Sequence, residues 1–516
     1  MKGSYVMNTA TKEFLKEIDA LSERRREEIR NTKDNVTVSG TAYYVSSSGD
    51  DNNDGLTPET AWKTLAKVSS APLNFGDAVR LKRGDIFRGT ILAKEGVTYC
   101  AFGEGAKPEI RSWDKNLADP DMWELYDTEN NIWKLKEKII DCGTIVFNEG
   151  ELHSLRHIPT YKNGKLVCRD DESREFIVSE QLKGDLECFS YCIDPARMSA
   201  YPTTRDGVVI DNSPVPTLDN GEVFGDLYLR CNKGNPGEIF HSIEALVRRI
   251  GINFTDKNYV RVDNICLKYI GWHGIKGGAC KHIKGLHVSN CEIGWIGGVI
   301  HNYYGNDPNF PEGMRGTVAR LGNGVEIYGG CDDFVVENCY LYQIYDCAIT
   351  HQVTTQGKHY EMKNVLYKDN LIEHCVYGIE YFLDMNCGDN ESFMENVEMC
   401  GNIIRHGGYG WGQQRHNKHT PALIKGWSFY NRGFNQTIHD NIFDRSQYRM
   451  LHLVAKKEEY CPTLNNNTYI QHHGGMIGQW GGNETKEPEI EFFDDAAEEK
   501  ITSVFGDKNA KIYIIK

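Results

Sequence analysis

Short stretches in which apolar and polar residues alternate recur between Tyr259 and Leu453. Each stretch begins at an Asn, continues with one or two apolar residues, crosses a polar gap and ends on a small residue and an apolar one. The residues that open the stretches are Asn264, Asn290, Asn338, Asn370, Asn402 and Asn441. They lie 26, 48, 32, 32 and 39 residues apart, so the unit is about 24–26 residues with insertions of differing length. A repeat of this size is typical of a solenoid or a propeller.

The stretches carry strand signals and no helical periodicity. Apolar β-formers stand at strand-like spacing, for example Val260, Val262, Ile265 and Leu267, and the runs break at Gly or Asn. Such short strands cannot bury a face alone, but they enclose a dry interior when successive coils stack. We therefore predict an all-β chain that forms a right-handed parallel β-helix. A β-propeller is the runner-up, although its repeats are longer and carry four strands each.

The recurring Asn fits an internal ladder, because its amide can bond the coils above and below at the ~4.8 Å strand spacing. Cysteines beside it would pack inside as small apolar residues. These are Cys266, Cys291, Cys339 and Cys375.

The pattern changes along the chain and divides it into five parts. The first holds an amphipathic helix with Phe14, Ile18, Leu21 and Ile29 near one stripe, packed on the solenoid or at a subunit contact. The second begins the β-helix and includes a short helix, Ala61 to Val68, that plugs its open end, with Thr57 as N-cap and Pro58 at its first position. The parts are 1–41, 42–112, an inserted β-sandwich-like domain over 113–250, the main β-helix with active-site loops over 251–487, and a C-terminal cap over 488–516.

Composition narrows the classes of partner. The net charge of −15 argues against nucleic acid or an anionic membrane, and it fits poorly with a strongly anionic polymer substrate. The 16 Cys show neither regular pairing nor zinc spacing, and no apolar run opens the chain. We expect a cytoplasmic protein without a metal or cofactor, and the sequence leaves a homo-oligomer open.

One outward row of the solenoid is rich in polar side chains. Aligning the coils on the apolar residue that ends each stretch places the next residue outside, since neighbours on a strand alternate faces. The predicted row is Lys276, Glu326, Thr350, Glu380, Gly412 and Leu451; the next outward row is Gly278, Tyr328, Gln352, Phe382, Gln414 and Leu453.

Four carboxylates fall on or beside this row. Glu326 and Glu380 are two coils apart, so ~9–10 Å between backbones, near the upper end of the ~6.5–9.5 Å carboxyl separation of inverting glycosidases. Asp346 precedes the intermediate strand, and pairing it with either Glu would allow the ~5–5.5 Å spacing of a retaining enzyme. Asp384 lies four residues after Glu380 on the same face. These four are the candidate catalytic residues. The alternative is that they are solvent-exposed residues on the outside of the β-helix with no catalytic role.

Three insertions point to the same face, and insertions in a solenoid tend to build binding walls. They are VIHNYYGNDPNFPEGMRGTVARLG before Glu326, VTTQGKHYEM after Thr350 and GQQRHNKHTPALIKG after Trp411. Aromatic faces suit sugar rings, while Arg, Gln and His bond hydroxyls. The candidate substrate-binding residues are Lys276, Tyr304, Arg320, Tyr328, His351, Gln352, Gln413, Arg415 and Trp427. Trp272 and His273 join this site or belong to a packed turn.

The opening YYVSSSGDDNNDGLTPETAWKTLAKV, followed by the strand FGDAVRLKRGDIF, resembles the pectate-lyase-like β-helix superfamily of carbohydrate-active enzymes. A β-helix with an inserted β-rich domain looks like bacterial glycosidases of this fold, including β-xylosidases. The resemblance implies sugar chemistry, but it carries no catalytic residue over.

Three hypotheses follow. The first is a glycoside hydrolase acting on short oligosaccharides, exo-acting and similar to a xylosidase, that uses two of the four carboxylates. The second is a polysaccharide lyase that performs β-elimination on a uronate with Lys276 or Arg320 as base and Ca²⁺ as an aid. The third is a non-catalytic glycan-binding β-helix.

Overall fold

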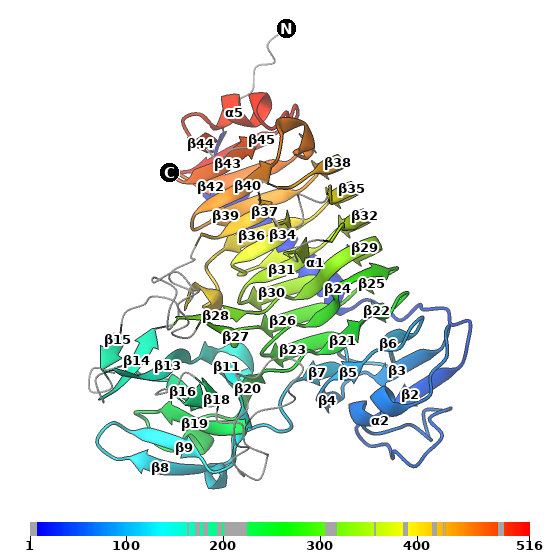
Figure 1. Ribbon diagram of the computed structural model, residues 1–516, viewed down its shortest axis with the longest axis vertical. Coiled ribbons are helices and arrows are strands. Elements are labelled where there is room, and N and C mark those ends of the chain that lie inside the picture. The colour runs from blue at the N-terminus through cyan, green and yellow to red at the C-terminus, as the bar shows by residue number, and fades with distance from the viewer. Residues whose placement is uncertain are drawn as a thin grey trace.

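The computed structural model describes residues 8–162, 165–170, 176–178, 184–191, 193–194, 199–200, 224–304, 317–354, 358–384, 391–414, 420–426, 428, 430–482 and 490–516. Its main body is a stack of coils in which strands of successive coils pair in parallel (Figure 1). Most of the coils contribute a strand to each of three stacks. The predicted all-β fold, a right-handed parallel β-helix with an inserted domain and an N-terminal helix, is confirmed.

The first stack forms an 11-stranded sheet of its own. Its strands, in spatial order, are β4 (Ile86–Arg88), β7 (Glu109–Arg111), β23 (Cys266–Ile270), β26 (Glu292–Ile296), β30 (Tyr340–Ile344), β33 (Leu371–Glu373), β36 (Ile403–Gly407), β39 (Ile442–Ser446), β42 (Thr468–His472), β45 (Lys511–Ile515) and β1 (Asn8–Thr9).

The second and third stacks are joined because β24 and β29 are long enough to contribute to both. The second stack holds β5 (Ile91–Leu92), β21 (Ile252–Thr255), β24 (Ile275–Lys284), β29 (Val325–Glu337), β31 (Cys347–Val353), β34 (Tyr377–Leu383), β37 (Ala422–Gly426), β40 (Arg449–Ala455) and β43 (Met476–Gly482). The third holds β2 (Ala42–Val45), β3 (Ala78–Lys82), β6 (Thr98–Phe102), β22 (Arg261–Asp263), the end of β24, β25 (His287–Ser289), the end of β29, β32 (Glu361–Lys368), β35 (Phe393–Cys400), β38 (Gly433–His439) and β41 (Thr463–Asn465).

An asparagine ladder runs inside the later coils. Asn370 donates its side-chain amide to Asn402 Oδ1 at 3.0 Å, Asn402 to Asn441 at 2.9 Å, and Asn441 to Asn467 at 3.0 Å. Each of these amides is almost fully buried. Asp507 ends the ladder by accepting from Asn467 at 2.8 Å. The ladder therefore satisfies buried polar groups along the axis of the β-helix, as the repeat predicted.

In the earlier coils the recurring Asn is displaced by one residue. Asn264, Asn290 and Asn338 adopt the left-handed conformation, with φ of 58°, 56° and 49°. The interior position belongs instead to Cys291 and Cys339, and the Cys339 backbone N–H donates to Asn370 Oδ1 at 3.0 Å. Asn thus has two structural roles in this repeat, because it readily adopts a left-handed turn and its side-chain amide can also form an interior ladder.

Replacing Asn402 by Ala is expected to lower the free energy of unfolding by about 2–3 kcal/mol. The change leaves Asn370 and Asn441 with buried polar groups that have lost a partner, and each such group costs about 1–3 kcal/mol. Denaturant titration measures the change. Asn396→Gly is the control, because Asn396 links Asn364 and Asn435 in a solvent-exposed amide ladder and its φ of 56° suits Gly. Equal losses in both variants would contradict the role given to the buried ladder.

Both ends of the coil are capped. Helix α2 (Leu65–Ser70) buries Leu65 and Val68 against the core, and Thr64, whose hydroxyl accepts from the Lys67 N–H, is its N-cap. The predicted start at Thr57 and Pro58 is wrong, because Thr57 and Thr60 instead form a turn closed by hydrogen bonds. At the far end, β44 (Ile490–Phe493), α5 (Ala497–Ser503) and β45 add apolar side chains to the same core.

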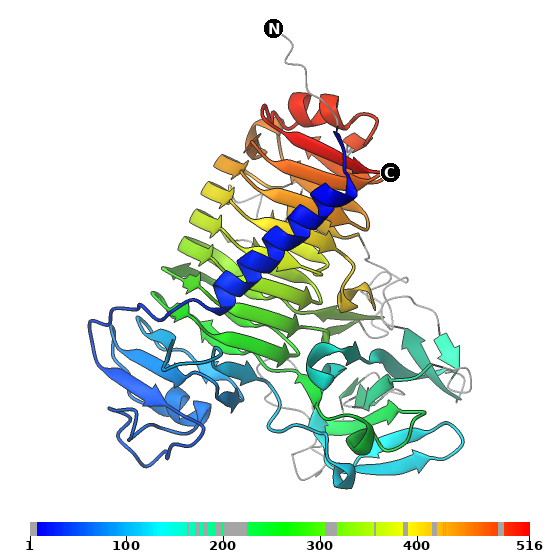
Figure 2. The same cartoon turned by 180° about the vertical axis from the view of Figure 1, so that it is seen from behind.

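Helix α1 (Lys12–Arg30) crosses the outside of the first stack as a diagonal strap (Figure 2). Its apolar side packs through Ile29, which belongs to one buried apolar cluster with Tyr340, Leu371 and Ile403. Ion pairs hold its C-terminal half, since Arg30 contacts Glu292 at 2.9 Å and Arg26 contacts Glu373 at 2.8 Å. No helix among the described residues combines the length and apolar content that crossing a bilayer requires.

A mostly antiparallel domain separates the first coils from the rest in sequence and lies at the same end of the molecule as those coils (Figure 1). Its main strands are β8 (Trp123–Asp127), β9 (Ile132–Leu135), β10 (Ile139–Ile140), β11 (Cys142–Phe147), β12 (Leu152–His153), β13 (Leu155–Lys162), β14 (Lys165–Asp170), β15 (Phe176–Val178), β16 (Glu187–Tyr191), β19 (Phe224–Arg230) and β20 (Ile243–Val247). It has a hydrophobic core of its own, built around Trp113, Trp123 and Phe147.

Buried polar contacts fix this domain to the β-helix. Arg156 pairs with Asp141 at 2.5 Å, and the other Asp141 oxygen accepts from the Ile300 N–H at 3.0 Å. Arg320, in the hairpin of β27 (Val299–Tyr304) and β28 (Thr317–Leu321), donates to the carbonyls of Gly298 at 2.6 Å and Gly143 at 2.9 Å. The two bodies are therefore joined by hydrogen-bonded charges rather than by a flexible linker.

Candidate active site

Strand register gathers one row of polar residues on the outer side of the second stack. Lys276 pairs with Glu326, Glu326 with Thr350, Thr350 with Glu380, and Glu380 with Lys425. We call these five residues the outer row. Their strand neighbours, such as Ile275, Val325 and Ile379, lie in the hydrophobic core, so the outer row faces away from it.

Glu326 is 2% exposed and surrounded by polar groups. Lys276 Nζ lies 2.6 Å from its Oε1. Its Oε2 accepts from the side-chain amides of Asn323 and, at 3.3 Å, Gln352. His273 Nδ1 lies 3.5 Å from Oε2 and accepts from the Asn323 backbone N–H at 3.1 Å.

These groups hold Glu326 in its ionised form. Burial raises the pKa of this carboxyl, but the imidazole of His273, the charge of Lys276 and hydrogen bonds from Lys276 and Asn323 outweigh it and lower the pKa to about 2. A carboxylate that stays ionised at neutral pH can act as a nucleophile or a general base, but not as an acid.

A second charged cluster lies two and three coils beyond Glu326, at Glu380 and Lys425. Lys425 Nζ is 3.0 Å from Glu380 Oε1 and 3.6 Å from the centre of the Tyr377 ring. Burial lowers the pKa of Lys425, but the neighbouring Glu380, Tyr377 and Asp346 side chains raise it above its ordinary value. Lys425 therefore stays charged beside the two carboxylates Glu380 and Asp346, which are 5% and 6% exposed.

Asp346 lies between the two clusters. Its backbone N–H donates to Gly322 O at 3.2 Å, and its carbonyl accepts from the Tyr377 N–H at 2.9 Å. The next N–H, that of Cys347, donates to the same Asn323 side chain that bonds Glu326. The backbone thus places Asp346 between the coils of Glu326 and Glu380, where the sequence put it.

Of the predicted substrate-binding residues, Lys276, Tyr328 and Gln352 join the site. Gln352 bonds Glu326, Lys276 Nζ lies 5.7 Å from the centre of the Tyr328 ring, and Tyr328 bonds Thr354 through its hydroxyl. Trp272 also belongs here, with its ring 5.8 Å from Lys276 Nζ.

His351 and Arg320 lie elsewhere, and their predicted place in the wall of the site is wrong. His351 is fully buried inside the β-helix, bonds Tyr367 at 2.7 Å and stacks on Tyr381, because it alternates with the outward Thr350 and Gln352. Arg320 is fully buried at the junction with the inserted domain, where its guanidinium binds backbone carbonyls.

The remaining candidates lie outside the outer row or outside the described residues. Asp384 directly follows β34, is partly exposed, and donates its backbone N–H to Val353 O at 3.1 Å. Gln413 is an exposed residue of the 3₁₀ turn η7 (Trp411–Gln414). The side chain of Tyr304, together with Arg415 and Trp427, lies outside the described residues.

No protein-family model matches the chain. A stretch of 127 residues is 36% identical to a lacto-N-biosidase of Bifidobacterium longum subsp. longum, and the match covers 22% of this chain and 8% of that protein. The chain therefore matches less than a tenth of the length of this curated relative.

Solved structures of low sequence identity align with most of the chain. A complex of XylC with xylose is 12% identical over 92% of this chain and 83% of that one, with a TM-score of 0.38. A GH136 lacto-N-biosidase from Eubacterium ramulus is 14% identical over 98% and 71%, with a TM-score of 0.34. An exopolygalacturonase from Thermotoga maritima is 10% identical over 92% and 98%, with a TM-score of 0.33. The roles of individual residues therefore rest on the geometry described above.

Sequence reasoning missed two members of the site, Asn323 and Lys425. Lys425 stands in an alternating run, ALIKG, which is a strand signal, but aligning the coil on Trp411 placed Gly412 in the row. Trp411 is instead in a 3₁₀ turn packed against Tyr345, and the coil resumes at β37.

The predicted Leu451 is wrong for a related reason. Leu451 pairs with Ile424 and faces inward, so His452, which pairs with Lys425, is the next outward residue. No signal marks Asn323, since a polar residue before a strand is common.

Proposed function

We propose that this protein is a glycoside hydrolase that acts on short oligosaccharides from their ends. The observation that carries the proposal is the outer row, in which two buried carboxylates on alternate coils each contact a lysine, with Asp346 between them. Hydrolysis of a glycosidic bond needs one carboxylate that is ionised and a second that delivers a proton. The partial similarity to a lacto-N-biosidase supports the same class of reaction.

In this proposal Glu326 is the ionised partner. Its low pKa lets it attack the anomeric carbon or activate water, and Lys276 and His273 orient it. The proton donor is then Glu380 or Asp346. Strand spacing puts the backbones of Glu326 and Glu380 ~9–10 Å apart, which suits inversion, whereas Asp346 is one coil away and suits retention.

The site favours a hydrolase over a lyase. A lyase on a uronate needs a basic side chain free to remove a proton, and the sequence offered Lys276 and Arg320 for that role. Arg320 is fully buried and bound to the carbonyls of Gly298 and Gly143, and Lys276 contacts Glu326 at 2.6 Å. Both lysines of the outer row are arranged to stabilise carboxylates of the protein.

A panel of aryl glycosides and short oligosaccharides tests the proposal, with products followed by chromatography and by ultraviolet absorbance. The proposal expects saturated sugar products from at least one substrate. An unsaturated product would identify a lyase, and binding without turnover would identify a glycan-binding protein.

We also propose that the protein works in a reducing compartment such as the cytoplasm. The 13 cysteines whose side chains the structure describes are free thiols, and eleven of them are buried. Free, mostly buried thiols suit a compartment in which disulfides do not form.

Replacing Lys276 by Met is expected to move the acid limb of the pH profile of kcat/KM upward by about one unit or more. Lys276 lowers the pKa of Glu326, so its loss raises that pKa, and activity then falls at a higher pH because Glu326 must be ionised. Lys281→Met is the control, since Lys281 lies on the same strand and pairs with the exposed Asp256 at 3.2 Å. If the acid limb of the pH profile did not move in Lys276→Met, the ionisation that activity requires would not be that of Glu326.

A further inference from the structure

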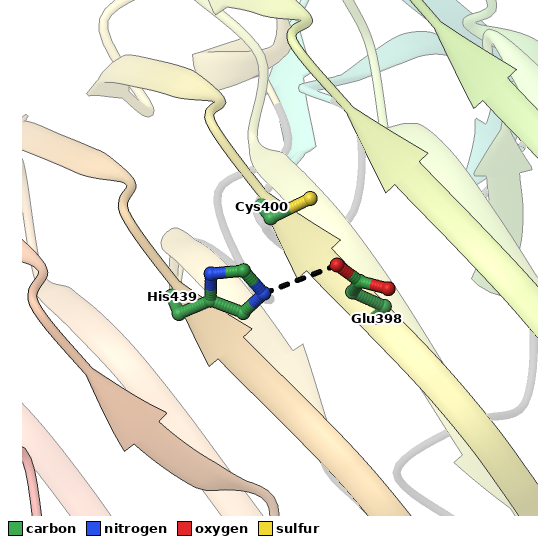
Figure 3. Close-up of side chains that lie close together, drawn as sticks. All are labelled: Glu398, Cys400 and His439. Carbon is green, nitrogen blue, oxygen red and sulfur yellow. Dashed lines mark hydrogen bonds and ion pairs between the residues drawn. The ribbon is translucent and has the colours of Figure 1, made fainter.

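A second group of chemically reactive side chains lies on the third stack, away from the outer row. Cys400 ends β35, and its neighbour in register on β38 is His439. Glu398 stands two residues before Cys400 on the same face of the same strand. Figure 3 shows the three side chains pointing toward a common space between the two strands.

The donor atoms are close enough to share one ion. His439 Nε2 is 3.1 Å from Glu398 Oε1, and the sulfur, nitrogen and carboxylate oxygen all lie within 4.8 Å of one another. Bonds of ~2.0–2.3 Å to a tetrahedral zinc ion would place its ligand atoms about 3.3–3.8 Å apart. Small side-chain rotations bring these donors to that spacing, because strand pairing already fixes their backbones. This is the single three-ligand group of its kind among the described residues.

A neighbouring carboxylate orients the imidazole. Asp440 Oδ2 lies 2.6 Å from His439 Nδ1, so the other ring nitrogen, Nε2, faces Cys400 and Glu398. A carboxylate that accepts from the far nitrogen of a metal-binding His is the usual arrangement around protein metals, since it sets the tautomer and the ring orientation.

The chemistry of the donors selects the metal. One thiol, one imidazole and one carboxylate form a mixed set that suits zinc, whereas Ca²⁺ and Mg²⁺ prefer oxygen ligands alone. Glu398 is exposed and His439 is partly exposed, so solvent reaches the group and can supply a fourth ligand.

We propose that Glu398, Cys400 and His439 bind one Zn²⁺ ion, with Asp440 as the residue that positions His439. The ion would join β35 to β38 and so cross-link two successive coils. This inference is independent of the proposed function, because the group lies on the third stack and shares no residue with the outer row.

Zinc binding to the full chain, stripped with a chelator, tests the proposal. Calorimetric titration with Zn²⁺ and metal analysis after dialysis should give one ion per chain. Cys400→Ser and His439→Gln should each weaken binding at least about 10-fold, and Asp440→Asn should weaken it by a similar factor. Co²⁺ in place of Zn²⁺ should give a thiolate charge-transfer band in the near ultraviolet that Cys400→Ser removes.

His287→Gln is the matched control. His287 also pairs with a carboxylate on the third stack, Glu337 at 2.8 Å, but it has no cysteine in the group. This variant should bind Zn²⁺ as the unchanged protein does. The proposal would be overturned if the unchanged protein did not bind Zn²⁺, or if Cys400→Ser and His439→Gln bound it as tightly as the unchanged protein. Because His439 is partly exposed, His439→Gln keeps the test valid if Cys400→Ser does not fold.

Discussion

Glu326→Gln is expected to lower kcat/KM for the hydrolysed glycoside by at least about 10³-fold while the protein stays folded. The amide has nearly the shape of the carboxylate but no charge, so it can neither attack the anomeric carbon nor take a proton from water. Positioned acid–base and nucleophilic groups contribute factors of this size. Steady-state kinetics measures the loss, and circular dichroism checks the fold.

Glu395→Gln is the control for this variant. Glu395 is a partly exposed acid on β35 that lies outside the outer row, so its replacement should leave kcat/KM within about two-fold. If Glu326→Gln retained the activity of Glu395→Gln, the ionised carboxylate of the outer row would have no part in the reaction.

Glu380→Gln and Asp346→Asn are expected to differ in how their activity depends on the leaving group. The variant that lacks the proton donor should lose about 10²–10⁴-fold on an oligosaccharide, yet remain within about 10-fold of the unchanged enzyme on a glycoside with an activated aryl leaving group. Such a leaving group departs without protonation, so the acid is then dispensable. The other variant should be impaired on both substrates or on neither.

Kinetics on the two substrates, with Lys425→Met as a third variant, separates these roles. Lys425 contacts Glu380 at 3.0 Å, so its loss should affect Glu380 chemistry in particular. If both carboxylate variants lost equal activity on both substrates, neither residue would be the acid. The anomer first formed, followed by nuclear magnetic resonance, then distinguishes inversion from retention.

The hydrophobic pattern was sufficient to predict the β-helix, because short alternating strands have few other ways to bury a face. It also placed Lys276, Glu326, Thr350 and Glu380 in one row, since a parallel register carries the alternation of each strand to the next. The position of Asp346 between the two Glu coils follows from the same logic.

The pattern misled where residues of the same type occupy different local structures. Asn338 and Asn370 look alike in sequence, yet the first occupies a left-handed turn and the second an interior ladder one residue later. Trp411 looks like the end of a coil, but it belongs to a 3₁₀ turn and so concealed Lys425. A single-residue displacement changes the face on which a side chain lies, and local spacing cannot detect it.

Other errors concern contacts between distant parts of the chain. Arg320 comes from an insertion, so the sequence indicated an exposed wall residue, whereas the inserted domain covers it completely. The pairing of His273 and Asn323 around Glu326 joins residues 50 positions apart, and no repeat marks it. Such contacts depend on how the bodies pack, which is a property of the whole fold.

The decisive experiment measures hydrolysis of a substrate from the glycoside panel by the unchanged protein and by Glu326→Gln, Asp346→Asn and Glu380→Gln in parallel. We expect turnover by the unchanged protein, a loss of at least about 10³-fold in Glu326→Gln, and a loss of at least about 10²-fold in one of the other two on the oligosaccharide. Full activity in all three variants would contradict this expectation.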